Sequence, residues 1–310
     1  MGRRLSWDRF RGLAILLMVI VNDLATARGI PALLKHAPEV GYTLADLVAP
    51  MFIFAMGLTF SKSFQKRYAK DKLDAYMSFI KRNLAFIGLG AIFSGVGIYF
   101  APDAGWGVLQ ALGVAGLMAL AAARLPTLWR ALAGLLILAA YQCALAFGMA
   151  PMVLEHLHGG FLGALSWGAM LILTTVLIDF YNGDQRKYHA SLLLLAACGA
   201  AISPVAPISK PLVSASYLLI SVALCGALLS LADLIEKRLH LEERRDFLCD
   251  WGENPLALYL AHYALIGILH LPNLFFDPPV WMSLIRTAVM LALLNQMART
   301  FHRKNIRISL

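Results

Sequence analysis

His36 and Asp46 lie ten residues apart, just before a long apolar run, and their side chains could carry acid–base chemistry. An imidazole has an unperturbed pKa of about 6.5, so it can gain or lose a proton near neutral pH. Ionisable groups at the edge of an apolar segment are costly and are often functional. The alternative interpretation is a solvated loop histidine followed by a helix-capping aspartate.

The elements that must position these two residues are membrane helices. Hydrophobic residues make up 60% of the 310 residues and charged residues only 15%, and the mean hydropathy is +0.69. A soluble core of this length does not need so much apolar surface. We therefore expect an all-α, polytopic membrane helix bundle that forms a single domain over residues 1–310.

Apolar runs of membrane-spanning length recur along the whole chain. A transmembrane helix needs about 17–25 predominantly apolar residues. Runs of this kind predict about ten transmembrane helices, at roughly 11–30, 42–61, 79–100, 106–123, 127–148, 160–181, 189–204, 211–234, 253–273 and 279–300.

The basic residues follow the alternation that such a topology requires. If the Arg11 end of the first helix is cytoplasmic, all of the 27 basic residues except Arg28, Lys35, Lys210 and Arg286 fall at the cytoplasmic ends of the spans. Cytoplasmic loops carry an excess of Lys and Arg. The pattern predicts that both termini are cytoplasmic.

The net charge of +9 is accounted for by these short loops. We expect membrane lipids as partners of the basic loops and no nucleic acid, because no soluble domain organises the charges. A homodimer remains an open alternative. The four cysteines show no CxxC spacing, so neither a disulfide framework nor a metal site is expected.

Several polar residues lie near the non-cytoplasmic ends of different predicted spans. Asn22 is in the outer half of the first span, Gln110 begins the fourth, and Ser214 and Tyr217 begin the eighth. Their shared level favours a polar cavity. The alternative is that these side chains form hydrogen bonds between helices without any chemical role.

Two ionisable residues lie deeper in the apolar segments. His262 is about nine residues into the ninth span and Arg286 about seven into the tenth. Each needs a partner or water inside the bundle. His262 is either part of the polar cavity or a hydrogen-bonded core histidine.

Five sequence segments resemble the catalytic core of the heparan-α-glucosaminide N-acetyltransferase family, a branch of the transmembrane acyltransferases. They are SWDRFRGLAILLMVIVN at 6–22, HAPEVGYTLADLVAPMFIFAMGLTFSKS at 36–63, GVLQALGV at 107–114, KPLVSASYLLISVAL at 210–224 and GENPLALYLAH at 252–262. The resemblance implies an enzyme that takes acetyl-CoA from the cytoplasm and acetylates the amine of a terminal glucosamine on the other side.

The resemblance also implies site residues. It places the active histidine at His36, the active-site asparagine at Asn22 and the aspartate of the ADLV motif at Asp46, and it matches His262 to a late histidine. We expect Asp46, His262 and the polar residues Gln110, Ser214 and Tyr217 to bind substrate. The chain departs from the family at 39–40, where Glu-Val replaces an aromatic residue followed by a polar one.

The residue types suit this chemistry. A sugar amine is largely protonated at neutral pH, and His36 could accept its proton as a general base. The amide of Asn22 could donate to the thioester oxygen as negative charge develops there. An acetyl-histidine intermediate is the alternative route.

Basic residues on the cytoplasmic side could hold the phosphates of acetyl-CoA. We expect Arg11, Lys81 and Arg82 to do so through charge-assisted hydrogen bonds, although each also fits ordinary cytoplasmic placement. An amino-sugar permease, and an O-acetyltransferase of a cell-envelope glycan, are the alternative functions. The expected location is a bacterial inner membrane, crossed many times.

Overall fold

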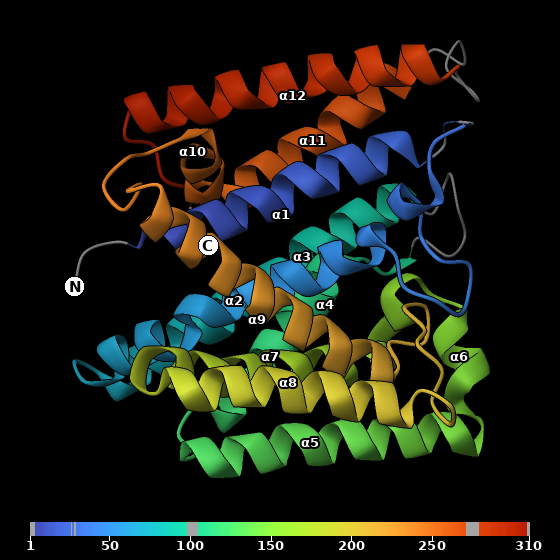
Figure 1. The fold of residues 1–310 in the computed structure, drawn as a ribbon, viewed down its shortest axis with the longest axis vertical. Helices are drawn as coiled ribbons and strands as arrows, with labels where there is room; N and C mark the ends of the chain where they lie inside the picture. Colours follow the sequence, from blue (N-terminus) through green and yellow to red (C-terminus); the bar gives the residue numbers. More distant parts are fainter. Residues whose placement is uncertain (1–3, 26, 28, 98–104, 271–278, 309–310) are drawn as a thin grey trace. The chain divides into compact units, whose positions relative to one another are not determined.

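The computed structural model describes residues 4–25, 27, 29–97, 105–270 and 279–308 (Figure 1). The secondary structure of these residues is helical, with no strand among them. The chain divides into two compact units. The first unit comprises residues 1–37, 43–51 and 227–309, and the second comprises 38–42 and 52–226.

The first unit contains four whole helices: α1 (Leu5–Leu24), α10 (Phe247–Glu253), α11 (Pro255–His270) and α12 (Val280–Arg303). Helix α1 contacts all three of the others. Figure 1 shows α1, α11 and α12 running side by side. The sequence segment that carries Asn22 therefore packs against two C-terminal helices.

The second unit contains most of the remaining helices. They are α3 (Lys72–Gly97), α4 (Val108–Ala122), α5 (Thr127–Ala144), α6 (Ala150–Leu154), α7 (Gly160–Gly183) and α8 (Gln185–Ile202). Helices α2 (Leu44–Tyr68) and α9 (Ala215–Arg238) each contribute residues to both units.

Every predicted span coincides with a helix, which confirms the expected all-helical membrane class. Among the described residues, five helical stretches are long and apolar enough to cross a membrane: Leu44–Tyr68, Thr127–Leu154, Leu157–Gly183, Ala215–Arg238 and Val280–Arg303. The number of spans, the sides of the termini and the single domain stay predictions. The predicted span ends at 26, 28, 98–100 and 271–273 lie outside the described residues.

Two glycines bring the backbones of α1 and α10 into contact. A Cβ atom at Gly12 would lie 2.1 Å from the main-chain oxygen of Leu248, and one at Gly252 would lie 1.9 Å from that of Asp8. Neither position can hold a larger residue without moving backbone. This contact fixes α10 against the first turns of α1.

An ion pair between a buried arginine and a partly exposed aspartate joins α5 and α7 in the second unit. The guanidinium of Arg130 contacts Asp179 and also donates to Ser61 (3.1 Å) and Thr175 (3.3 Å). The residue is only 4% exposed. Arg130 was among the basic residues assigned to the cytoplasmic ends of the spans, and its contacts show that it also has a packing role.

Candidate functional site

His36 and Asp46 form a hydrogen-bonded pair. His36 follows a single turn of 3-10 helix at Ala32–Leu34, and Asp46 lies in the first turn of α2. The Nδ1 atom of His36 is 2.8 Å from Oδ1 of Asp46. The histidine side chain is 41% exposed, whereas that of the aspartate is fully buried. The imidazole of His36 is therefore accessible to a ligand, while its Nδ1 atom is bonded to a buried carboxylate.

The second carboxylate oxygen of Asp46 organises the loop that carries His36. It accepts hydrogen bonds from the main-chain N–H of Ala37 (3.1 Å), the N–H of Thr43 (3.1 Å) and the hydroxyl of Thr43 (2.9 Å). The Thr43 contacts cap the start of α2, which is the helix-capping role considered from the sequence. Asp46 thus serves both as a cap and as the partner of the histidine.

Asn22 lies in the last turn of α1 and forms a side-chain hydrogen bond with Tyr263 of α11.

His262, which precedes Tyr263 in α11, is fully buried, and neither of its ring nitrogens has a hydrogen-bond partner among the described residues. A buried polar group normally has a hydrogen-bond partner, so we expect water or a ligand group to bond to the His262 ring. Substrate binding by His262 stays a prediction.

The partner that Arg286 was expected to need is Asp23. The Nε atom of Arg286 lies 2.7 Å from Oδ1 of Asp23, and the arginine also donates from Nη2 to the main-chain oxygen of Asp23 at 2.7 Å. Both side chains are almost completely buried. Sequence reasoning missed Asp23, although an acidic residue inside one apolar span and a basic residue inside another were a signal for this pair.

Gln110 caps α4. Its Oε1 atom accepts from the N–H of Gly107 (2.7 Å) and from the hydroxyl of Ser94 on α3 (3.2 Å). Its Nε2 atom lies 3.4 Å from the main-chain oxygen of Gly105. These bonds give Gln110 a structural role, and substrate binding by this residue stays a prediction.

Ser214 and Tyr217 lie together where α9 begins. The Ser214 hydroxyl donates to the main-chain oxygen of Pro207 (2.8 Å) and accepts from the N–H of Ser209 (3.1 Å) and, more distantly, of Tyr217 (3.4 Å). The Tyr217 ring is fully buried, 5.5 Å from the ring of Tyr42. Both residues belong to the second unit, whereas His36, Asp46, Asn22 and His262 belong to the first.

The predicted phosphate-binding residues Lys81 and Arg82 line a hollow along one face of α3. The hollow has a volume of about 390 Å³ and is lined by Asp74, Met77, Ser78, Lys81, Arg82 and Ala85. The Arg82 guanidinium also lies over the ring of Phe79, 5.1 Å from its centroid. Arg11 lies in the other unit and forms an ion pair with Asp8 at 3.1 Å.

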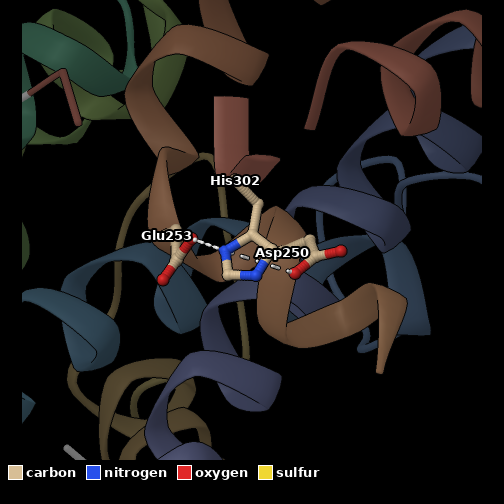
Figure 2. Close-up of side chains that lie close together, drawn as sticks. All are labelled: Asp250, Glu253 and His302. Atoms are coloured by element: carbon tan, nitrogen blue, oxygen red, sulfur yellow. Dashed lines mark hydrogen bonds and ion pairs between the residues drawn. The ribbon is translucent and has the colours of Figure 1, made fainter. Parts of the chain in front are cut away.

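A cluster of charged side chains from α10 and α12 resembles a metal site in its residue types. Figure 2 shows Asp250 and Glu253 of α10 beside His302 of α12, and the ligand atoms of all three lie within 4.8 Å of one another. His302 Nδ1 is 2.9 Å from Glu253. Arg245 reaches both carboxylates, at 3.2 and 3.1 Å. The arginine supplies the positive charge, so the geometry is that of an ion-pair network.

Comparison with known proteins agrees with the resemblance found in the sequence. The family model described as "Heparan-alpha-glucosaminide N-acetyltransferase, catalytic" matches residues 3–157. This range includes Asn22, His36 and Asp46, together with the three predicted phosphate-binding residues and Gln110. Ser214, Tyr217 and His262 lie beyond it.

Two relatives share the first part of the chain. The protein of Homo sapiens named heparan-alpha-glucosaminide N-acetyltransferase is 36% identical over 119 residues, which are 35% of this chain and 17% of the human protein. The protein of the same name from Mus musculus is 37% identical over 117 residues, 34% of this chain and 17% of its own length. The chain thus matches less than a fifth of the length of these relatives. Because the family match covers half of its residues and its helices are apolar, this chain is a transmembrane protein that belongs to the heparan-alpha-glucosaminide N-acetyltransferase family.

Proposed function

We propose that this protein transfers the acetyl group of cytoplasmic acetyl-CoA to the amine of glucosamine, or of a terminal glucosaminide, on the periplasmic side of a bacterial inner membrane. The observation that carries the proposal is the His36–Asp46 pair within the segment matched by the family model. A half-exposed imidazole bonded to a buried carboxylate is suited to accept a proton from a bound amine.

The proton transfer would take place at Nε2 of His36, because Nδ1 is bonded to Asp46. The carboxylate holds the ring in one orientation and stabilises the imidazolium that forms, as the aspartate of a catalytic triad does. This geometry supports a role for Asp46 as a positioning residue that acts through His36. The sequence had grouped it with the substrate-binding residues.

The deprotonated amine would attack the thioester carbon, and the tetrahedral intermediate would expel the CoA thiolate. The nitrogen would pass its surplus proton to that thiolate, which leaves as CoA thiol. The Asn22 amide would donate a hydrogen bond to the thioester oxygen while it carries negative charge. In the alternative route, His36 itself attacks the thioester and carries the acetyl group before the amine takes it. Asp46 would orient the ring in both routes.

The residues of α3 fit the phosphates of acetyl-CoA. Lys81 and Arg82 offer two cationic side chains beside a hollow of about 390 Å³, and such groups bind phosphate through charge-assisted hydrogen bonds. When bound, acetyl-CoA supplies the activated acetyl group. Arg11 is a weaker candidate because Asp8 already engages it.

The proposed topology has about ten spans and both termini in the cytoplasm, with residues 1–310 forming one acyltransferase domain. The distribution of the basic residues along the sequence supports this topology. Lipids would surround the apolar helices, of which α5 and α12 expose large side chains such as Leu128, Trp129, Trp281 and Ile285.

The test is the release of free CoA by the purified protein in detergent. On addition of acetyl-CoA and glucosamine, the wild type should release CoA and form N-acetylglucosamine in equal amounts. N-acetylglucosamine as the acceptor should give no release, because it has no amine to acetylate. Release with both acceptors would indicate O-acetyl transfer, and release with neither, together with binding of glucosamine, would favour a permease.

A further inference from the structure

The last turn of α1 is held from α12 by three contacts, all of which involve Asp23. Arg286 forms an ion pair with the Asp23 carboxylate and donates to the Asp23 main-chain oxygen, both at 2.7 Å. The hydroxyl of Thr287 donates to the other carboxylate oxygen at 2.5 Å. Arg286 and Thr287 are each 6% exposed, and Asp23 is fully buried. Asp23, the residue that follows Asn22, is therefore fixed through both its side chain and its main-chain oxygen.

These contacts restrict the helix end more than packing alone would. The last carbonyl groups of a helix have no partner within the helix, so its final turn frays unless another group binds them. Arg286 binds one of these carbonyl oxygens. A buried ion pair also tolerates little displacement, because each charge would otherwise be left without compensation.

Asn22 precedes Asp23 by one residue and therefore points about 100° away from it around the helix axis. Its amide forms a hydrogen bond with Tyr263 of α11. Fixing the backbone at Asp23 from α12 thus sets the direction of the Asn22 side chain towards α11.

We propose that Asp23, Arg286 and Thr287 form a clamp that positions Asn22 for acetyl transfer. The inference rests on the proposed function, since it takes Asn22 as the group that stabilises the reacting thioester oxygen. The three clamp residues do not touch the substrate in this account. They are positioning residues, and their effect should pass through Asn22.

The informative variant is Thr287→Val. Replacement of Arg286 by Ala would leave a buried carboxylate without its charge partner and would be expected to unfold the protein. Thr287→Val keeps the shape of the side chain and removes the hydroxyl that donates to Asp23. Thr287→Ser keeps the hydroxyl and should restore the wild-type behaviour.

Thr300→Val is the matched control. Thr287 and Thr300 lie on the same helix, and each hydroxyl oxygen lies close to the carbonyl oxygen four residues earlier, at 2.9 and 2.8 Å. The single hydrogen of the Thr287 hydroxyl also faces the Asp23 carboxylate, which is the nearer acceptor at 2.5 Å. Both valine variants lose the hydroxyl beside that carbonyl oxygen, and only Thr287→Val loses a contact with Asp23, so a difference between them reports the clamp.

Two readouts are needed for these variants. Hydrogen exchange by mass spectrometry should show faster exchange at residues 21–25 in Thr287→Val and no change in Thr300→Val. The kcat for glucosamine acetylation should fall by about 10- to 100-fold in Thr287→Val, since misplacement of a reacting group by about 1 Å can cost on the order of 10²-fold. The KM for acetyl-CoA should not change.

A double-variant cycle tests whether the effect passes through Asn22. In an Asn22→Ala background, Thr287→Val should lower kcat by less than about 2-fold, because coupled residues are not additive. A full loss in that background would contradict the inference, as would unchanged exchange or unchanged kcat in Thr287→Val. A wild type that transfers no acetyl group would overturn the proposed function and the role of Asn22 with it, whereas exchange would still show whether the clamp itself exists.

Discussion

At the scale of single residues, the imidazole ring of His36 is partly exposed to solvent and also bonded to a buried group. The ring is 41% exposed, yet one nitrogen is bonded to a carboxylate that is fully buried. Burial of Asp46 keeps water from competing for the bond. A base held in this way can accept a proton from a substrate without having to reorient first.

We predict that Asp46→Asn lowers the rate of acetyl transfer by about 10²-fold or more, within the range usually supplied by general acid–base catalysis. The amide keeps the size of the side chain but cannot stabilise an imidazolium. Initial rates of CoA release with glucosamine would measure the effect, with a thermal melt in detergent to confirm folding. Glu155→Gln, which changes an exposed carboxylate, should keep the wild-type rate, and an equally active Asp46→Asn protein would remove Asp46 from the mechanism.

The sequence predicted His36, Asn22 and Asp46 as a group but not how they bond. Asp46 was expected to contact substrate, because spacing in the sequence cannot show that a loop of ten residues folds back to bring His36 within 2.8 Å of it. Asp23 was not predicted as a site residue. Its partner Arg286 is 263 residues away along the chain, and no local pattern joins the two.

At the scale of helices, close backbone contact decides how α1 meets α10. The predicted spans located the long helices because an apolar run of sufficient length has few other structures in a membrane. The predicted span was shorter than α2, because the helix continues to Tyr68 through charged residues that lie outside an apolar run. The seven-residue helix α10 was not predicted, because it is too short to produce a periodic pattern.

Gly252→Ala should destabilise the protein by about 1–3 kcal/mol, the usual cost of overpacking. The added methyl group would lie 1.9 Å from the main-chain oxygen of Asp8, which cannot move without shifting α1. Gly267→Ala on α11 is the control, since a Cβ atom there meets nothing within 4 Å. Reversible unfolding in mixed micelles would measure both, and equal stability of the two variants would argue against the tight contact.

Asp246, in the segment between α9 and α10, should make the stability of the folded protein depend on pH. Burial opposes ionisation of Asp246, but hydrogen bonds from Arg9 and from the main-chain N–H of Cys249 outweigh it, so the pKa of Asp246 is lowered. The bond to Arg9 is 2.7 Å long. A lowered pKa in the folded protein means that Asp246 contributes stability above its unfolded pKa of about 3.9, and that this contribution is lost as the pH falls through the folded value.

Asp246→Asn should therefore destabilise the protein at pH 7, and its difference from the wild type should shrink as the pH falls below about 4. Melting temperatures in detergent between pH 3 and pH 7 would measure the difference. Glu155→Gln should run parallel to the wild type over the whole range. A constant difference between Asp246→Asn and the wild type would show that the charge of Asp246 is not responsible.

At the scale of the whole molecule, the proposed function needs acetyl-CoA and the sugar amine to approach from opposite sides. The cationic residues on α3 and the His36–Asp46 pair belong to different compact units of the chain. It is the sequence that predicts opposite sides for them, because Lys81 and Arg82 lie among the basic loops and His36 does not. Moving the charged nucleotide of acetyl-CoA into the hydrocarbon layer would cost a large free energy. Only the flexible arm of acetyl-CoA, with its thioester, would therefore approach Asn22 and His36.

Sided proteoliposomes test this claim most directly. Acetyl-CoA would be supplied only to the face that carries Lys70, glucosamine only to the opposite face, and N-acetylglucosamine would be measured in each compartment. Orientation would be assigned by labelling single cysteines at positions 70 and 39 in a variant without native cysteines. We predict product on the glucosamine side with wild-type protein, and a rate about 10²–10⁴-fold lower with His36→Ala. Product that forms only when both substrates share one compartment would contradict transfer across the membrane.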